Sequence, residues 1–319
     1  MPSWILPGRK DAPITRYKAI LEKSFAYSRT FNQRNPEYNW YSLWNQTLSD
    51  LVSDIPNVIV APQYPVWFIP QNDEEIEEDE GDGDGNDPEE IEVTIGGSHH
   101  SRHAECTLLE VDDEDGVDAD VSFASTTPEK DAKSVIVDFA IINLSAVPLH
   151  QPRQKVRYGG WKITQANVGL LVEIKRFVSR GLTDAESKKA LEGRIIEAHD
   201  DLVTQAAHLF LQDEGKDSVL AIAAAGISSM HFRHTCHDSY PLIGLYWCST
   251  KISRGDVKKS MRTFRELDTT YQGSDSNIDN EELKWSSLLR LDLARSNDRL
   301  HTIYKSLKES GVLRTPGDV

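Results

Sequence analysis

The chain of 319 residues contains few cysteines and no long apolar segment. Because no stretch of 18 apolar residues occurs, we expect no transmembrane helix and no membrane partner. The first residues lack the basic start and the apolar block of a secretory signal. Three cysteines cannot form a disulfide framework, and they fit a reducing compartment. We therefore expect an intracellular protein of the cytoplasm or the nucleus.

Three familiar catalytic motifs are also absent. The sequence contains no Gly-x-x-x-x-Gly-Lys-Ser/Thr, no Gly-x-Gly-x-x-Gly and no Gly-x-Ser-x-Gly. Without them, nothing in the sequence favours an NTPase, a dinucleotide-binding enzyme or an α/β-hydrolase.

Acidic residues are concentrated in one segment. The net charge is -16, but residues 73–120 contain 21 acids and one base, a net charge of -20. The remaining chain holds 34 bases and 30 acids, a net charge of +4, which is compatible with a polyanionic ligand. Residues 73–92 carry 13 carboxylates, three glycines and no base, which predicts a mobile, disordered acidic insertion.

Hydrophobic spacing predicts an α/β fold with a central mixed sheet flanked by helices. Residues 14–52 read as helical with a break at Pro36, and Thr183 and Asp184 begin a long helix that ends near residue 211. Further helices are expected at 253–267 and 280–307. Strands are expected at 57–61, 64–69, 92–95, 106–111, 120–125, 135–144, 168–177, 218–229 and 242–248.

This order suggests four regions along the chain. They are an N-terminal helical region with the first strands (1–72), the acidic insertion (73–92), an α/β core (93–250) and C-terminal helices that pack on the core (251–319).

Two of the expected strands carry charged residues inside apolar runs. Asp138 is the one acid in residues 134–142, and Glu173 and Lys175 interrupt the run at 170–177. Side chains alternate across a strand, so Glu173 and Lys175 point to the same face. Burying a charge is costly unless it is paired or holds a metal, so neighbouring strands with this feature indicate a site.

At these three residues the chain resembles the PD-(D/E)XK nuclease superfamily, which has a restriction-endonuclease-like core. The resemblance implies that Asp138 and Glu173 hold Mg²⁺ or Mn²⁺, with the Ile174 carbonyl as a further ligand. It implies that Lys175 is the catalytic cation and that metal-activated water hydrolyses phosphodiester bonds of DNA or RNA. The order of segments is also similar to that of fungal proteins.

The resemblance extends to two helical residues. Such nucleases often complete the metal site with a glutamate on an upstream helix, which is Glu37 here. Some use a glutamine on the helix after the second strand, and Gln205 lies on the apolar stripe of that expected helix. Two departures are clear: Val137 replaces the proline of the family name, and Leu209 replaces the tyrosine that can follow the glutamine.

Other interpretations stay open for the same residues. Glu173, Lys175 and Asp138 can form an ordinary cross-strand ion pair. Gln205 can be a hydrogen-bonded core residue, and Glu37 an acid favoured at a helix start. The alternative function is a catalytically inactive module of the same fold that binds nucleic acid or a protein partner.

Three further groups carry weaker signals. His99, His100, His103 and Cys106, and also His231, His234, Cys236 and His237, could hold zinc but lack a recognised zinc-finger spacing. A surface or loop role is the more common explanation for both groups. The basic run at 251–265 could contact phosphates, although a solvated helix face is the more common explanation.

Overall fold

The computed structural model describes residues 4–28, 30, 32, 38–68, 132–148, 161–176, 178–179, 182–228, 243–265 and 283–309. All of them belong to one compact unit. The acidic segment 73–92 and the expected strands at 92–95, 106–111 and 120–125 lie outside the described residues.

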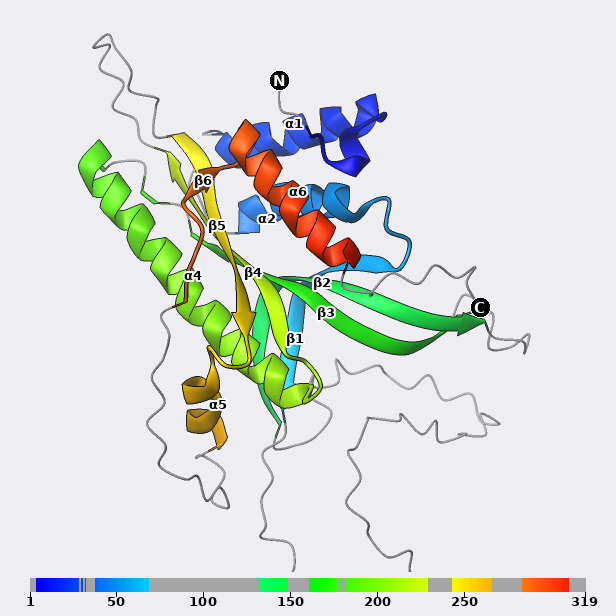
Figure 1. Cartoon of the computed structure of the whole chain (residues 1–319). Helices are drawn as coiled ribbons and strands as arrows, with labels where there is room; N and C mark the ends of the chain where they lie inside the picture. Colours follow the sequence, from blue (N-terminus) through cyan, green and yellow to red (C-terminus); the bar gives the residue numbers. More distant parts are fainter. Residues whose placement is uncertain are drawn as a thin grey trace, which may run out of the picture. The chain divides into compact units, whose positions relative to one another are not determined.

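Helices begin the described chain, three strands follow, and helices and strands are then interspersed up to the last described helix (Figure 1). The helices are η1 (Pro7–Arg9), α1 (Pro13–Tyr27), α2 (Tyr38–Val52), α4 (Asp184–Gln212), α5 (Lys258–Arg265) and α6 (Ala294–Glu309). The strands are β1 (Val58–Phe68), β2 (Lys133–Pro148), β3 (Trp161–Lys175), β4 (Ser218–Ser228), β5 (Ile243–Ser253) and β6 (Leu289–Arg290).

The strands form one mixed six-stranded sheet in the order β1-β2-β3-β4-β5-β6. Among these described strands, β3 and β4 are the one parallel pair, and the other neighbours are antiparallel. The long helix α4 makes the connection between the two parallel strands, as a parallel pair requires. The expected α/β class with a central mixed sheet is therefore confirmed.

Helices α1, α2 and α6 cover one face of the sheet. Their core is rich in tryptophan: Trp40 and Trp44 of α2 and Trp247 of β5 are fully buried. The rings of Trp44 and Trp247 meet edge to face with centroids 6.4 Å apart. The indole Nε1 of Trp247 donates to Ser296 Oγ of α6 at 2.9 Å, so both helices are tied to the sheet.

Helices α4 and α5 cover the opposite face. The alternation of β4 places Ala221, Ala223 and Ala225 toward α4, and Ile222 and Ala224 toward the tryptophan-rich core. The small alanine side chains allow α4 to lie close to the strand. The apolar stripe expected for α4 is buried throughout, at Leu191, Ile195, Ala198, Leu202, Ala206 and Leu209.

Helix α4 begins at the cap that the sequence predicts. Thr183 Oγ1 accepts a hydrogen bond from Glu186 N, and Glu186 Oε2 accepts one from Thr183 N at 2.9 Å. This reciprocal capping box satisfies two backbone donors at the helix start.

None of the helices in the described part of the chain combines the length and the apolar composition that a membrane span requires.

Three local expectations were wrong. Residues 58–68 form one strand instead of two, with an irregularity at Gln63, whose φ is 50°. Helix α5 starts at Lys258 because Ser253 N and Oγ donate to the Asp256 carboxylate and form a turn first. Helix α6 starts at Ala294, because residues 284–291 run along the open edge of β5 and hydrogen-bond to it. An unpaired strand edge recruits backbone partners, and that long-range demand overrides the local helical pattern.

The capping box gives a direct test of this fold. Thr183→Ala should lower the free energy of unfolding by about 1 kcal/mol and the melting temperature by about 2–4 °C, because one helix-end donor loses its acceptor. Thermal unfolding followed by circular dichroism measures this change.

Thr302→Ala is the matched control. Thr302 is an exposed mid-helix residue of α6, and alanine has the higher helix propensity there. Its melting temperature should be unchanged or slightly higher; an equal loss in both variants would contradict the role of the cap.

Candidate functional site

The candidate site lies where β2 and β3 separate. The two strands pair from Pro148 with Trp161 up to Phe139 with Val172, and the ladder stops there. Beyond that point, among the described strands, β2 pairs only with β1 and β3 pairs only with β4. Asp138 and Glu173 are the first residues past this split, one on each strand. The split brings together two carboxylates that are 35 residues apart in sequence.

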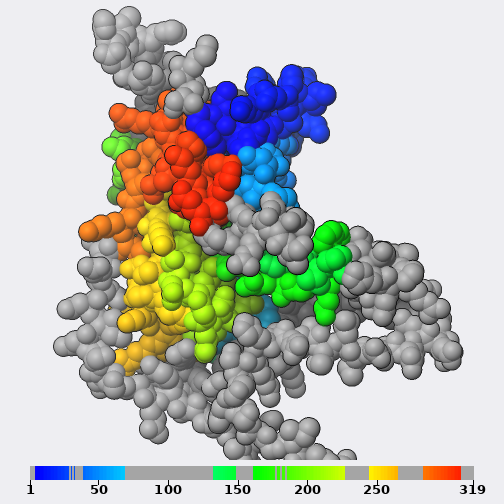
Figure 2. Space-filling view, turned by 45° about the vertical axis from the view of Figure 1, so that its right-hand side comes forward, coloured from blue at the N-terminus to red at the C-terminus, as the bar shows by residue number. Residues whose placement is uncertain are grey.

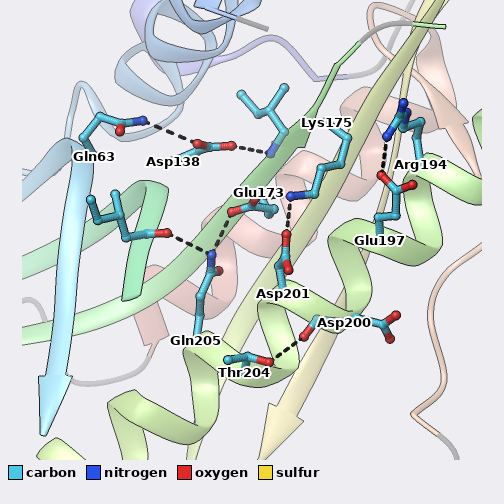
Figure 3. A network of polar contacts seen from close by, with 12 residues as sticks. Gln63, Asp138, Glu173, Lys175, Arg194, Glu197, Asp200, Asp201, Thr204 and Gln205 are labelled. Carbon is cyan, nitrogen blue, oxygen red and sulfur yellow. Dashed lines mark hydrogen bonds and ion pairs between the residues drawn. The ribbon is translucent and has the colours of Figure 1, made fainter. Parts of the chain in front are cut away.

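Asp138 crosses the split with its side chain (Figure 3). Its Oδ2 accepts a hydrogen bond from the backbone N–H of Ile174 on β3 at 2.7 Å. Its Oδ1 accepts from Tyr41 of α2 at 2.5 Å and from Gln63 Nε2 of β1 at 3.4 Å. The carboxylate is buried, and it replaces the ladder hydrogen bond that the separated strands no longer make.

Glu173 and Lys175 contact each other on the same face of β3, as the alternation of the strand predicts. Lys175 Nζ donates to Glu173 Oε1 at 2.6 Å, and it also pairs with the carboxylate of Asp201 on α4. Glu173 is buried, whereas about half of the Asp201 side chain is exposed. Lys175 therefore lies between a buried acid and one that reaches the solvent.

Gln205 of α4 closes the site from the helix side. Its Nε2 donates to Glu173 Oε2 at 2.8 Å and to the carbonyl of Ile136 on β2 at 3.2 Å. The side-chain oxygen Oε1 is buried and accepts no hydrogen bond from the residues that the structure describes. An unsatisfied buried acceptor is costly, so a water or a cation beside Oε1 would stabilise the site.

The environment of Glu173 disfavours its charged form. Burial and the neighbouring charge of Asp138 raise the pKa of this carboxyl to about 7, against the opposing effects of Lys175 and Gln205. Near neutral pH, ionisation of Glu173 is therefore energetically unfavourable, and a bound cation would stabilise its charged form. Strongly shifted carboxyls of this kind concentrate at functional sites.

Lys175 shows the opposite balance. Burial alone lowers the pKa of its ammonium group, but hydrogen bonds and ion pairs with Asp201 and Glu173 outweigh burial and raise the pKa above its ordinary value. The side chain is therefore a permanent cation at neutral pH, suited to stabilise negative charge and unsuited to act as a base.

The structure brings together four of the residues that the sequence singled out: Asp138, Glu173, Lys175 and Gln205. Ile174 lies among them, with its N–H bound to Asp138; the role of its carbonyl as a metal ligand stays a prediction. Glu37 lies outside the described residues, directly before α2.

Sequence reasoning missed three residues of the site: Tyr41, Gln63 and Asp201. A signal existed for Asp201, because it precedes Gln205 by four residues and must share its helix face. Tyr41 had a weaker signal, since it follows Glu37 by four residues on the expected helix. Nothing local marks Gln63, which reaches Asp138 only because β1 is irregular there.

A second polar pair joins α4 to β5. His199 Nε2 lies 3.1 Å from Cys248 Sγ, and the imidazole stacks on Trp285. Burial lowers the pKa of His199 to about 4 and raises the pKa of Cys248 to about 12, so both groups are neutral. A nucleophilic cysteine needs the reverse shifts, so this pair is part of the core and is not a catalytic dyad.

The structure describes the basic run at 251–265 but neither of the two His/Cys groups, which lie outside the described residues. Among the residues that the structure describes, no group of three or more His, Cys, Asp or Glu side chains is placed to hold a metal. In the basic run, Arg254 donates to the carbonyls of Asp213, Glu214 and Lys216, so its role is to tie a loop to β5.

Comparisons of the chain with protein-family models, with curated proteins and with solved structures found no match.

The shifted carboxyl predicts a specific pH dependence. In metal-free buffer, the free energy of unfolding of the wild type should fall relative to Glu173→Gln as the pH rises from 4.5 to about 7. Folded Glu173 keeps its proton in this window while the unfolded chain has lost it, and the fall should total roughly 3 kcal/mol. Urea unfolding at several pH values measures it.

Glu197→Gln is the control, because Glu197 lies exposed on the same helix and pairs only with Arg194 among the described residues. Its pH dependence should follow the wild type. Parallel curves for the wild type and Glu173→Gln would show that Glu173 titrates as an ordinary surface carboxyl.

Proposed function

We propose that the chain is a Mg²⁺- or Mn²⁺-dependent nuclease with a restriction-endonuclease-like core, which hydrolyses phosphodiester bonds of nucleic acid. The observation that carries the proposal is the convergence of Asp138, Glu173 and Lys175 at the split between β2 and β3. The chain order α2, β1, β2, β3, α4, β4, with β3 and β4 parallel, supports the core assignment.

The donor set fits a hard divalent cation. Mg²⁺ is usually held by one or two carboxylates, with water and phosphate oxygens completing its shell, so two protein carboxylates are sufficient. Asp138 and Glu173 supply them, with the Ile174 carbonyl and Glu37 as further expected ligands. Burial and the charge of Asp138 raise the pKa of Glu173, and Gln205 Oε1 is a buried acceptor without a partner among the described residues, so a cation at the site would stabilise both groups.

A bound Mg²⁺ or Mn²⁺ supplies positive charge that polarises a phosphodiester and makes water a stronger nucleophile. Lys175 Nζ, held by Asp201 at the solvent side, can donate to the attacking water or to the oxygen on which negative charge develops. Gln205 fixes Glu173 Oε2 through its Nε2, and its unsatisfied Oε1 can accept a hydrogen bond from a water in the site. Tyr41 fixes Asp138 Oδ1 in the same way.

Cleavage assays test this proposal. The wild type should cleave at least one of single- or double-stranded DNA or RNA when Mg²⁺ or Mn²⁺ is present, and none in EDTA. Asp138→Asn, Glu173→Gln and Lys175→Ala should each lower the rate at least about 100-fold, because the first two remove a charged ligand of the expected metal and the third removes the cation that stabilises the reacting phosphate.

Lys188→Ala removes the same charge from an exposed position of α4 and should cleave like the wild type. If the wild type and Lys175→Ala behave alike on every substrate, the catalytic assignment is wrong.

A second candidate is an inactive module of the same fold that binds nucleic acid. What favours it is that every oxygen of Asp138 and Glu173 already has a protein partner, and Lys175 Nζ contacts two acids. Such a site can serve only to hold the separated strands together.

The two candidates differ in their response to Asp138→Asn. An inactive module should bind nucleic acid without cleaving it, and its affinity should be the same in Mg²⁺ and in EDTA. Asn keeps the size of the side chain, so the variant should then bind like the wild type. A metal-dependent affinity that Asp138→Asn abolishes would contradict the inactive module.

A further inference from the structure

Strands β2 and β3 continue past the rest of the sheet as a two-stranded ribbon (Figure 1). The last β1 partner on β2 is Asn143, and the first β4 partner on β3 is Leu170. Within the described part of the chain, residues 145–148 and 161–166 therefore pair only with each other, and all of them are exposed. We call these two segments the β2–β3 ribbon; its green atoms project from the sheet in Figure 2.

The β2–β3 ribbon exposes large apolar side chains on both of its faces. Val147 and Trp161 are each 45% exposed, and Ile163 is 51% exposed. The register pairs Val147 with Lys162 and Ala146 with Ile163, which places Trp161 and Ile163 on one face and Val147 and Lys162 on the other. Thr164 is an extra residue in this ladder, a bulge that increases the local twist. Exposed apolar groups on a projecting ribbon mark an interaction surface.

The charge of this part of the chain points to a polyanion. Residues 144–166 contain four bases and no acid, in a chain whose net charge is -16. Lys162 lies on the β2–β3 ribbon itself. The other three bases, Arg153, Lys155 and Arg157, belong to the sequence that joins its two strands and lie outside the described residues. Positive charge of this density attracts a nucleic-acid backbone.

We propose that the β2–β3 ribbon binds duplex DNA by entering the major groove, so that the substrate of the proposed nuclease is double-stranded DNA. The major groove of B-form DNA is about 12 Å wide and admits a two-stranded ribbon. The major groove of A-form RNA is too narrow for side chains to read, and a single strand has no groove. In the groove, Lys162 contacts phosphate, and Trp161 and Ile163 contact apolar base edges such as thymine methyl groups.

The length of β2 sets the distance between the β2–β3 ribbon and the candidate site. Ala146 follows Asp138 by eight residues on β2, which spans about 26 Å at the rise of a strand. This corresponds to about eight base pairs of B-form DNA. A substrate that occupies both must extend at least that far from the cleaved bond.

The proposed function depends on cleavage, whereas the ribbon proposal depends on DNA binding. Binding measured in EDTA, where the metal-dependent cleavage cannot occur, therefore tests the ribbon separately. Fluorescence anisotropy should show that the wild type binds a DNA duplex of about 24 base pairs more tightly than an RNA duplex or single-stranded DNA of the same sequence. Lys162→Glu and Trp161→Ala should each weaken binding to the DNA duplex about tenfold or more. Lys162→Ala should lower the salt dependence by about one counterion.

Lys305→Glu makes the same charge change on an exposed position of α6 and should bind like the wild type. All four variants alter exposed residues, so their melting temperatures should match that of the wild type. Equal affinity for the three nucleic acids, or wild-type affinity in Lys162→Glu and Trp161→Ala, would overturn the proposal.

Sedimentation gives another contradicting outcome. A dimer that Trp161→Ala dissociates, with DNA affinity unchanged, would assign the β2–β3 ribbon to contact between two copies of this chain. The two proposals can fail separately. DNA binding without cleavage would contradict only the nuclease function. Cleavage that Lys162→Glu leaves unchanged would contradict only the contact between the ribbon and DNA.

Discussion

The separation of β2 from β3 is the constraint on which the candidate site depends. A sheet that splits leaves backbone donors and acceptors without a neighbouring strand, and buried groups of this kind must find other partners. Here the Asp138 carboxylate takes the N–H of Ile174, and the Gln205 amide donates to the carbonyl of Ile136. The Gln205 Nε2 that donates to Ile136 also donates to Glu173 Oε2, and the charge of Asp138 acts on the same carboxyl. Fold and site share one set of hydrogen bonds.

Closing the split does not by itself require two acids. Asparagine at 138 and glutamine at 173 could make several of the same hydrogen bonds without placing two negative charges in a buried position. The charge of Asp138 and the burial of Glu173 instead raise the pKa of Glu173 to about 7. Sequences that retain such a local cost usually do so at functional sites. Two buried acids at the split are therefore better explained by a cation site than by a purely structural role.

Local patterns predicted the parts of the structure that local interactions decide. The cap at Thr183, the apolar stripe of α4 and the shared face of Glu173 and Lys175 follow from spacing along one element, so the sequence was sufficient. Tyr41 and Gln63 come from other elements and reach Asp138 only through tertiary packing. Residues 284–291 were expected to be helical, but they run along the edge of β5. This pairing depends on a distant strand and leaves no periodic pattern in the sequence.

The central claim is that Asp138 and Glu173 together bind one divalent cation, and calorimetric titration with Mn²⁺ at pH 8 tests it most directly. We expect saturable binding to the wild type and to the exposed-residue variant Glu197→Gln. Binding should weaken at least tenfold, by a rough estimate, in both Asp138→Asn and Glu173→Gln, since each variant removes a charged ligand. Identical heats in all four proteins, or no binding to the wild type, would contradict the claim.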